Sequence, residues 1–230
     1  MARPALARPM GRTPDFAAER KRMVDRLLAS GYIRDPLVRD AFLAVPREAF
    51  VRPGDRDDTY ADVPLPIGLG QTISAPSMIA IMLEEARLRP GERVLEIGTG
   101  SGYHAALLAR IIGPGNVVTI ERLPDVAAWG RSNLARVGLA GVTVVVGDGS
   151  LGYPERAPYA CIMATAGAPR IPDGWRAQLA TGGRIVAPVG ATRHGQVLVV
   201  ATLGPDGTLR IREGTPCAFV PLVGEAAWPE

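Results

Sequence analysis

Cysteine and histidine are scarce in this chain, and their scarcity excludes several kinds of site. The 230 residues include two cysteines, Cys161 and Cys217, and two histidines, His104 and His194. Both cysteines lie in apolar surroundings without Cys-x-x-Cys spacing, so the sequence predicts neither a disulfide framework nor a zinc site and fits a reducing compartment. We therefore expect no metal ion, and we interpret both histidines as incidental to function.

Long apolar runs are also absent. No stretch reaches the roughly 18 apolar residues of a membrane-spanning helix, and residues 1–14, rich in arginine and proline, lack the apolar core of a signal peptide. The net charge of +3 is not gathered into a basic stripe with interleaved aromatic residues. We expect a cytoplasmic protein that binds neither a membrane nor nucleic acid, with residues 1–14 as a mobile tail.

The remaining composition is that of a folded enzyme. Hydrophobic residues make up 47% of the chain and charged residues 21%, which is too apolar for a disordered protein. A chain of this length can build one sizeable core, and no interior segment has the composition of a linker. We expect a single domain over residues 15–230. No apolar helix face is clearly left over, so we expect a monomer.

Periodicity divides the chain into a helical start and an alternating body. Apolar residues at helical spacing predict helices over 15–30 and 36–45, which form a cap ahead of the main fold. Residues 51–73 hold too many prolines for a central strand and predict a long ordered loop. From residue 77 onward, helices and strands alternate.

This alternation predicts an α/β fold with a doubly wound, mostly parallel sheet. Runs such as 94–97 and 142–146 are apolar on both faces, so we expect these strands to be covered by helices on both sides. The segment from 196, with a turn at 204–207, predicts an antiparallel pair at the edge of the sheet. The expected strands are 93–98, 117–121, 142–148, 160–166, 184–190 and 196–204, and the expected helices are 77–88, 104–113, 126–138 and 173–180.

A glycine-rich loop after the first of these strands is the strongest functional signal. The segment VLEIGTGSGY places Glu96, Gly98, Gly100 and Gly102 at the carboxyl end of the strand, where open parallel sheets bind ligands. A dinucleotide-binding loop would need glycine where Tyr103 stands, and no Gly-x-x-x-x-Gly-Lys-Ser/Thr pattern is present. The remaining pattern, Glu-x-Gly-x-Gly-x-Gly, resembles the signature of the Rossmann-like S-adenosylmethionine-dependent methyltransferases.

Two acids at later strand ends fit the same cofactor. Glu121 closes the next strand, roughly 20 residues beyond the loop, where an acid in such folds accepts hydrogen bonds from ribose hydroxyls. Asp148 and Gly149 close the third strand, and in the methyltransferases that the loop resembles an acid there contacts the adenine amine. Three strand ends in register predict that the chain binds S-adenosylmethionine.

The segment before the main fold identifies the methyl acceptor by resemblance. The chain is similar to the protein-L-isoaspartate O-methyltransferases, in the compact form of archaea and some bacteria, from about residue 18 to the C-terminus. The first of the shared segments is the specific one, because many methyltransferases share the glycine loop. The segments are YADVPLPIGLGQTISAPSM (60–78), VLEIGTGSGY (94–103), GDGSLGYPERAPY (147–159), QLATGGRIVAPVG (178–190) and CAFVPLVG (217–224).

This resemblance implies an activity and a set of site residues. The activity is methyl transfer from S-adenosyl-L-methionine to the free carboxylate of L-isoaspartyl residues in damaged proteins and peptides, which initiates repair through a succinimide. Ser74 is the implied active-site serine. The implied cofactor-binding residues are Gln71, Thr72, Glu96, Gly98, Thr99, Gly100, Ser101, Gly102, Tyr103, Glu121, Asp148 and Gly149, and the implied substrate-binding residues are Ile73, Ser74, Ala75, Val220, Pro221, Leu222 and Val223.

The chemistry agrees with a chain that is poor in histidine. A carboxylate is already ionised at neutral pH, so its methylation needs no general base. The enzyme must align the carboxylate with the methyl group, desolvate it in part and hold it with donors. The hydroxyl of Ser74 and nearby backbone N–H groups are suited to this.

Two alternative functions remain open, because the sequence departs from the family's pattern at two positions and because a glycine-rich loop does not by itself establish catalysis. Members of the family often carry histidine in the place of Ser77 and aspartate in the place of Ala160, which leaves room for an enzyme that methylates a normal aspartate in a dedicated peptide. Enzymes of that kind usually carry an extra C-terminal region, which is lacking here. The second alternative is a non-catalytic binding module, against which the intact glycines and strand-end acids count.

Overall fold

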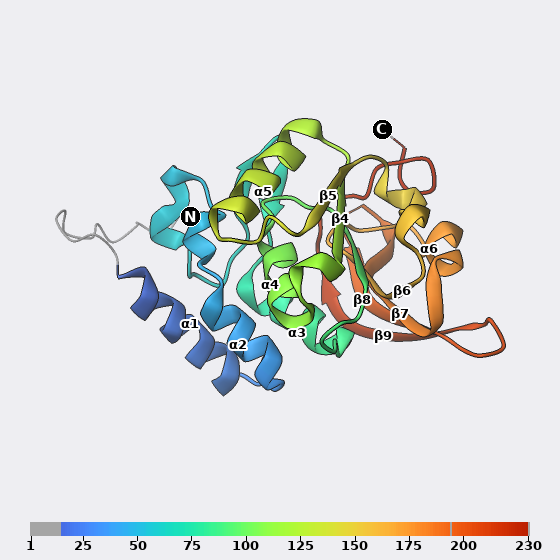
Figure 1. Ribbon diagram of the computed structural model, residues 1–230, viewed down its shortest axis with the longest axis horizontal. Coiled ribbons are helices and arrows are strands. Elements are labelled where there is room, and N and C mark those ends of the chain that lie inside the picture. Colours follow the sequence, from blue (N-terminus) through green and yellow to red (C-terminus); the bar gives the residue numbers. More distant parts are fainter. Residues whose placement is uncertain (1–14, 194, 230) are drawn as a thin grey trace.

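A seven-stranded sheet organises residues 15–193 and 195–229, which are the residues that the computed structural model describes (Figure 1). The strand order is β5-β4-β3-β6-β7-β8-β9; neighbours from β5 to β7 are parallel, and β8 and β9 continue the sheet antiparallel. The strands are β3 (Val94–Ile97), β4 (Val117–Glu121), β5 (Thr143–Val146), β6 (Tyr159–Ala164), β7 (Leu179–Thr192), β8 (Gly195–Leu203) and β9 (Leu209–Cys217). The predicted α/β class and the antiparallel edge are confirmed, whereas the predicted tail, residues 1–14, lies outside the described residues.

Alternate residues of the buried strands face two separate cores. In β3, Val94 belongs to the core formed with the large helices, whereas Leu95 and Ile97 belong to the core on the other face, together with Trp175 of α6. The C-terminal segment adds Leu222 to that second core. The helices of the body are α3 (Pro76–Ala86), α4 (Tyr103–Ile112), α5 (Pro124–Arg136) and α6 (Asp173–Ala177).

One expectation about the sheet is wrong. The apolar run that ends at Val146 was expected to be covered on both faces, yet β5 is the last strand of the sheet and is only half-buried. Val146 is 47% exposed. Periodicity reports that consecutive residues are apolar, but it does not report the position of a strand in the order of the sheet.

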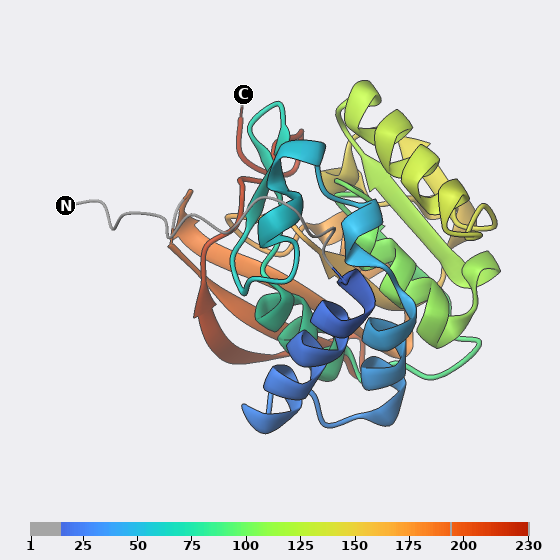
Figure 2. The same ribbon diagram turned by 90° about the vertical axis from the view of Figure 1, so that its left-hand side faces the viewer.

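The two N-terminal helices form the predicted cap. They are α1 (Phe16–Ala29) and α2 (Pro36–Ala44), and each begins at an aspartate, Asp15 or Asp35, whose side chain accepts a backbone N–H of the first turn. The helices lie side by side, and α2 packs against α4 (Figure 2). Phe42 of α2 is fully buried in that contact.

The segment predicted as a long loop contains a small hairpin. After the 3-10 helices η1 (Arg47–Ala49) and η2 (Pro53–Asp58), β1 (Leu65–Gly68) pairs antiparallel with β2 (Gln71–Ile73). The turn between them has positive φ at Gly68, Leu69 and Gly70, of 96°, 52° and 73°. The hairpin forms a sheet of its own, so Pro66 takes no hydrogen-bonding position from a central strand.

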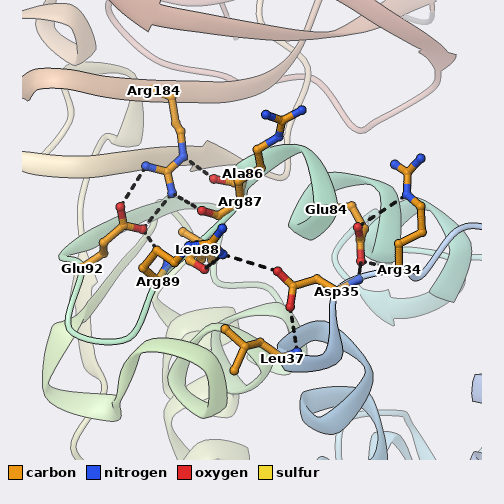
Figure 3. Close-up of polar contacts among 10 residues, drawn as sticks. All are labelled: Arg34, Asp35, Leu37, Glu84, Ala86, Arg87, Leu88, Arg89, Glu92 and Arg184. Carbon is orange, nitrogen blue, oxygen red and sulfur yellow. Dashed lines mark hydrogen bonds and ion pairs between the residues drawn. The ribbon is translucent and has the colours of Figure 1, made fainter.

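An ion-pair network joins the cap to the sheet at the end opposite the carboxyl ends of the parallel strands (Figure 3). Arg184 of β7 pairs with both carboxylate oxygens of Glu92, at 2.8 and 3.1 Å, and donates to backbone carbonyls at the end of α3. Asp35 of the cap pairs with Arg89 at 3.4 Å, and Glu84 of α3 accepts the backbone N–H groups of residues 34 and 35.

Candidate active site

Three loops meet where the central parallel strands end. Ile97 of β3 is paired with Ile120 of β4 and with Ala164 of β6, so the residues that follow these three strands lie at one edge of the sheet. They are the glycine loop, Glu121 with the residues after it, and Thr165. The carboxyl edge of an open parallel sheet is where such folds bind ligands.

The surroundings that require glycine differ between the positions of the loop. Gly98, Gly100 and Gly102 all have positive φ, of 96°, 52° and 86°. A Cβ at Gly98 would overlap the hydroxyl of Thr165, whereas a Cβ at Gly100 would have only the tip of Ile67, 3.6 Å away, as a neighbour. Gly98 therefore permits close packing of the chain, and Gly100 keeps open a space that a Cβ would fill.

Glu121 fixes this loop and retains capacity to bind more. Glu121 is 9% exposed. Its Oε2 accepts the N–H of Gly100 at 3.0 Å, and its Oε1 accepts the N–H of Leu123 at 3.1 Å. Each carboxylate oxygen has two lone pairs, so each can accept a further hydrogen bond. The acid predicted from the sequence thus lies at the strand end with acceptors available to a ligand.

Three hollows lie next to one another at this edge of the sheet. The strand-end cavity, of about 660 Å³ including its opening to solvent, is lined by Gly98, Gly100, Ile120, Glu121, Leu123 and Gly149, among others. The helix-end cavity, of about 390 Å³, lies at the start of α4 and is lined by Ile73, Ile79, Met82, Ser101 and His104 with the glycine loop. The outer groove, of about 530 Å³, is lined by Pro64, Ala75, Met78, Cys217, Ala218, Phe219 and Val220.

The hollows converge on three hydroxyl-bearing residues. Thr72 and Thr165 line all three, and Ser74 lines both the helix-end cavity and the outer groove. The hydroxyl of Thr165 donates toward the carbonyls of Gly98, at 2.8 Å, and Ile97, at 3.1 Å. Sequence reasoning missed Thr165, whose only signal is its place directly after a buried strand.

Most of the residues predicted for the site line these hollows. The predicted cofactor residues Gln71, Thr72, Gly98, Gly100, Glu121 and Gly149 line the strand-end cavity, and Thr99 and Ser101 line the helix-end cavity. The predicted substrate residues divide: Ile73 lines the helix-end cavity, Ser74 also the outer groove, and Ala75 the outer groove, while Val220 lines the strand-end cavity as well as the outer groove. Pro221, Leu222 and Val223 line the strand-end cavity and not the outer groove.

Three predicted cofactor residues lie beneath or behind the loop. Glu96 is fully buried and accepts hydrogen bonds from Thr119 Oγ1 at 2.5 Å and from His104 Nδ1 at 2.7 Å. Tyr103 is buried against Phe42 and Phe50, so its ring faces the N-terminal cap and lines none of the three hollows. Gly102 also lies behind the loop, against Gly130 and Leu134 of α5.

Asp148 ties the C-terminal segment to the site. Its Oδ1 accepts the N–H of Ser150 at 2.9 Å, and its Oδ2 accepts the N–H of Glu225 at 2.8 Å. Burial acts to raise the pKa of Asp148, but the hydrogen bonds from Glu225 and Ser150 outweigh it, so the pKa lies below its usual value. Its neighbour Gly149 lines the strand-end cavity, whereas Asp148 itself does not.

Three arginines hold the hairpin segment by its backbone. Arg26 donates to the carbonyl of residue 60 at 2.9 Å, Arg47 to those of residues 59 and 74 at 2.8 and 2.9 Å, and Arg52 donates twice to that of residue 67 at 2.9 and 2.6 Å. We call Arg26, Arg47 and Arg52 the arginine clamp. Arg47 is fully buried, which lowers its pKa by desolvation. The clamp fixes Ser74 through the carbonyl group of Ser74. No sequence motif predicted the arginine clamp.

The described residues hold no group of three or more histidine, cysteine, aspartate or glutamate side chains arranged for a metal ion. In the same part of the chain, no helix combines the length and the apolar character needed to cross a membrane.

Comparison with known proteins agrees with the arrangement of this site. The model of the family described as protein-L-isoaspartate(D-aspartate) O-methyltransferase matches residues 18–227. A protein-L-isoaspartate O-methyltransferase of Hyperthermus butylicus is 52% identical, over 94% of this chain and 92% of its own length, and one of Methanopyrus kandleri is 51% identical, over 94% and 96%.

Solved structures show the same fold. A protein-L-isoaspartate O-methyltransferase structure has a TM-score of 0.80 and 31% identity, over 90% of this chain and 67% of that one. A Plasmodium falciparum protein assigned to the same activity, solved in complex with S-adenosyl-L-homocysteine, has a TM-score of 0.78 and 25% identity, over 89% and 98%. With a family model matched along nearly its whole length, the chain belongs to the protein-L-isoaspartate(D-aspartate) O-methyltransferase family.

Proposed function

We propose that this chain transfers the methyl group of S-adenosyl-L-methionine to the free carboxylate of L-isoaspartyl residues in damaged proteins and peptides. The observation that carries the proposal is the convergence of the strand-end cavity, the helix-end cavity and the outer groove on Thr72 and Thr165, beside Ser74, which lines the last two. A cofactor and a peptide held in these hollows would meet at that point. Membership in the family and the relatives' activity support the same reaction.

The residues of the strand-end cavity fit S-adenosylmethionine. Gly100 leaves space for close approach of the ligand, and Glu121 has free lone pairs for ribose hydroxyls. We assign direct contacts to Gln71, Thr72, Gly98, Thr99, Gly100, Ser101, Glu121 and Gly149, and a supporting role behind the loop or the cavity wall to Glu96, Gly102, Tyr103 and Asp148.

The bound cofactor supplies an electrophilic methyl group on a sulfonium centre. The chain's own task is to position the carboxylate, because the free α-carboxylate of an isoaspartyl residue is already ionised at neutral pH and needs no base. The hydroxyl of Ser74 donates a hydrogen bond that orients the carboxylate, and the arginine clamp holds the backbone of Ser74 in place. The apolar side chains of the outer groove exclude water from the peptide around it.

The steps after methyl transfer do not need the enzyme. Without further catalysis, the following backbone amide nitrogen attacks the ester carbonyl, methanol leaves, and a succinimide forms. Addition of water opens the succinimide and returns part of the material as normal aspartate. We further propose that the chain acts as a cytoplasmic monomer, folded as a single domain over residues 15–230, with damaged proteins and not nucleic acid or a membrane as its partner.

A methyl-transfer assay with three acceptors tests the proposal. The acceptors are an isoaspartyl peptide, the same peptide with a normal aspartate, and a small carboxylic acid. We expect turnover of the isoaspartyl peptide alone, and we expect Ser74→Ala to lower that turnover while the affinity for S-adenosylhomocysteine stays within about twofold. Equal methylation of the aspartyl peptide would favour the peptide-tailoring alternative, and no heat of binding with S-adenosylmethionine would favour the binding module.

A further inference from the structure

One ring nitrogen of His104 is satisfied and the other is not. The side chain is 7% exposed, and its Nδ1 lies 2.7 Å from Oε1 of Glu96. Its Nε2 is buried and has no hydrogen-bond partner among the described residues. A buried polar atom left unpaired is unfavourable, so this nitrogen points to a partner other than the protein chain.

The residues beneath the loop decide what Nε2 can do. Glu96 accepts hydrogen bonds from both Thr119 and His104, and Thr119 shares a further hydrogen bond with Thr99 at 2.8 Å. A carboxylate oxygen only accepts, so the hydrogen lies on Nδ1, and a neutral imidazole then carries its lone pair on Nε2. The two ring nitrogens point away from each other. Nε2 therefore faces away from Glu96, and the ring lines the helix-end cavity.

The helix-end cavity offers a second, opposite kind of contact. It lies at the N-terminus of α4, where the first N–H groups of a helix lack acceptors within the helix and carry partial positive charge. Such a helix end suits a carboxylate, whereas the lone pair of Nε2 suits an ammonium group. One molecular group combines both charges at short separation: the zwitterionic end of an α-amino acid.

The helix-end cavity adjoins the proposed nucleoside site. Thr72, Gly98, Gly100 and Thr165 line both the helix-end and the strand-end cavity. A ligand with a nucleoside at one end and an α-amino acid at the other can therefore occupy both. S-adenosylmethionine has this construction, so the inference rests on the proposed function and deepens it.

We propose that Nε2 of His104 accepts a hydrogen bond from the α-ammonium group of the cofactor. Glu96 is then a positioning residue that holds the hydrogen on Nδ1 and orients the ring, so that Nε2 is the nitrogen left to accept. His104 becomes a specificity-determining residue, since a nucleoside without the amino-acid end makes no contact with it. This replaces the expectation from the sequence that His104 is incidental.

Binding calorimetry with two ligands tests the proposal without catalysis. S-adenosylhomocysteine carries the amino-acid end and methylthioadenosine lacks it. We compare the wild type with His104→Leu, His104→Asn and His104→Gln. An asparagine amide can meet Glu96 but does not reach the position of Nε2, whereas a glutamine amide reaches it, so the two form a matched pair.

The expected result is a loss of affinity for S-adenosylhomocysteine alone, in two of the three variants. His104→Leu and His104→Asn should bind S-adenosylhomocysteine about tenfold or more weakly, the scale of one hydrogen bond to a charged group, and methylthioadenosine within about twofold of the wild type. His104→Gln should retain most of the affinity. Melting curves identify any variant that does not fold, and the Asn and Gln pair remains decisive if the Leu variant fails.

Two results would overturn the proposal. The first is unchanged affinity for S-adenosylhomocysteine in all three variants, and the second is an equal loss for both ligands, which would indicate that His104 only supports the loop. A wild-type protein that binds no S-adenosylhomocysteine would instead reject the proposed function itself.

Discussion

Gly98 and Gly100 are neighbours in one loop, yet the same substitution should affect them differently. Gly100→Ala places a Cβ in open space, at φ of 52°, so the fold should survive with a strain of roughly 1–2 kcal/mol. The methyl group would fill space that we assign to the cofactor. We expect calorimetry to show S-adenosylhomocysteine affinity reduced by at least roughly 100-fold, with the circular dichroism spectrum unchanged.

Two further variants serve as controls for that measurement. Gly138→Ala introduces comparable strain, at φ of 76° and with open space around the Cβ, but lies outside the three hollows, so its affinity should match the wild type. Gly98→Ala should lower the melting temperature further than Gly100→Ala, because its Cβ overlaps the hydroxyl of Thr165. Full affinity in Gly100→Ala would mean that the ligand lies elsewhere.

Glu121 should contribute to cofactor affinity through its free lone pairs. Glu121→Ala should weaken S-adenosylhomocysteine binding by about 1.5–3 kcal/mol, the scale of hydrogen bonds to a charged group, as measured by calorimetry. Asp125→Ala removes an equal charge from an exposed position in the first turn of α5 and serves as the control. Equal affinity in both variants would reject the ribose-binding role of Glu121.

Cys217 should be a slow thiol although it lines the outer groove. Burial raises its pKa to about 11, against about 8.5 for a free cysteine, so little reactive thiolate is present at pH 8. Alkylation of the native protein by iodoacetamide, followed by peptide mapping, should be at least roughly 100-fold slower than in urea and should rise about tenfold per pH unit from pH 8 to 10. A flat pH profile would contradict this environment.

At the scale of elements, the hairpin depends on side chains from outside it. Arg52 of the arginine clamp donates twice to the carbonyl of Ile67 and lies over the ring of Trp129 on α5, 4.3 Å from its centroid. These contacts link the hairpin, the helix beside the glycine loop, and the N-terminal segment. The three arginines of the clamp, all in the first 52 residues, therefore have a structural use.

Loosening this contact should reduce turnover more than cofactor affinity. Arg52→Met should lower kcat/KM for an isoaspartyl peptide by roughly 10- to 100-fold, since small displacements of the residues that position a substrate are costly. Hydrogen exchange of the amides in residues 65–73 should accelerate in parallel. Arg56→Met, on the exposed surface of η2, is the matched control and should change neither. Unchanged exchange in Arg52→Met would remove Arg52 from the clamp.

The same elements explain what the sequence could and could not predict. Helical and strand periods located α1 to α5 and the parallel strands. The place of Glu121 was predictable because an acid at the carboxyl end of a buried parallel strand lies at the edge of the sheet where such folds bind ligands. The direction of Tyr103 was not predictable, since it depends on the packing of the cap against α4. Thr165 and the clamp depend on contacts between segments far apart in the chain, which no local pattern encodes.

At the scale of the whole molecule, the ion-pair network and the active site occupy opposite ends of the sheet. The network joins residue 35 of the cap to residues 84–92 and to β7 (Figure 3). At the other end, Arg26 of the cap, a member of the arginine clamp, donates to the carbonyl of residue 60, in the segment that leads to the hairpin. Contacts at both ends support our proposal that residues 15–230 form one domain, in which loss of the network lowers stability without touching the site.

The pH dependence of stability tests the network. Burial acts to raise the pKa of Glu92, but hydrogen bonds from Arg184 and from the N–H of Arg89 outweigh it, so the pKa lies below its usual value. A carboxylate with a lowered pKa stabilises the fold above its unfolded pKa, about 4.3, and this contribution is lost as the pH falls through the folded value.

Glu92→Gln should therefore lower the melting temperature by a constant amount from pH 8 to about pH 5, and the difference from the wild type should shrink below about pH 4. Affinity for S-adenosylhomocysteine at neutral pH should be unchanged, because the network lies at the far end of the sheet. Glu213→Gln, on the exposed edge strand β9, is the control and should melt like the wild type across this range. A difference that grows on acidification would reverse the sign required by a lowered pKa and would exclude Glu92 as a stabilising anion.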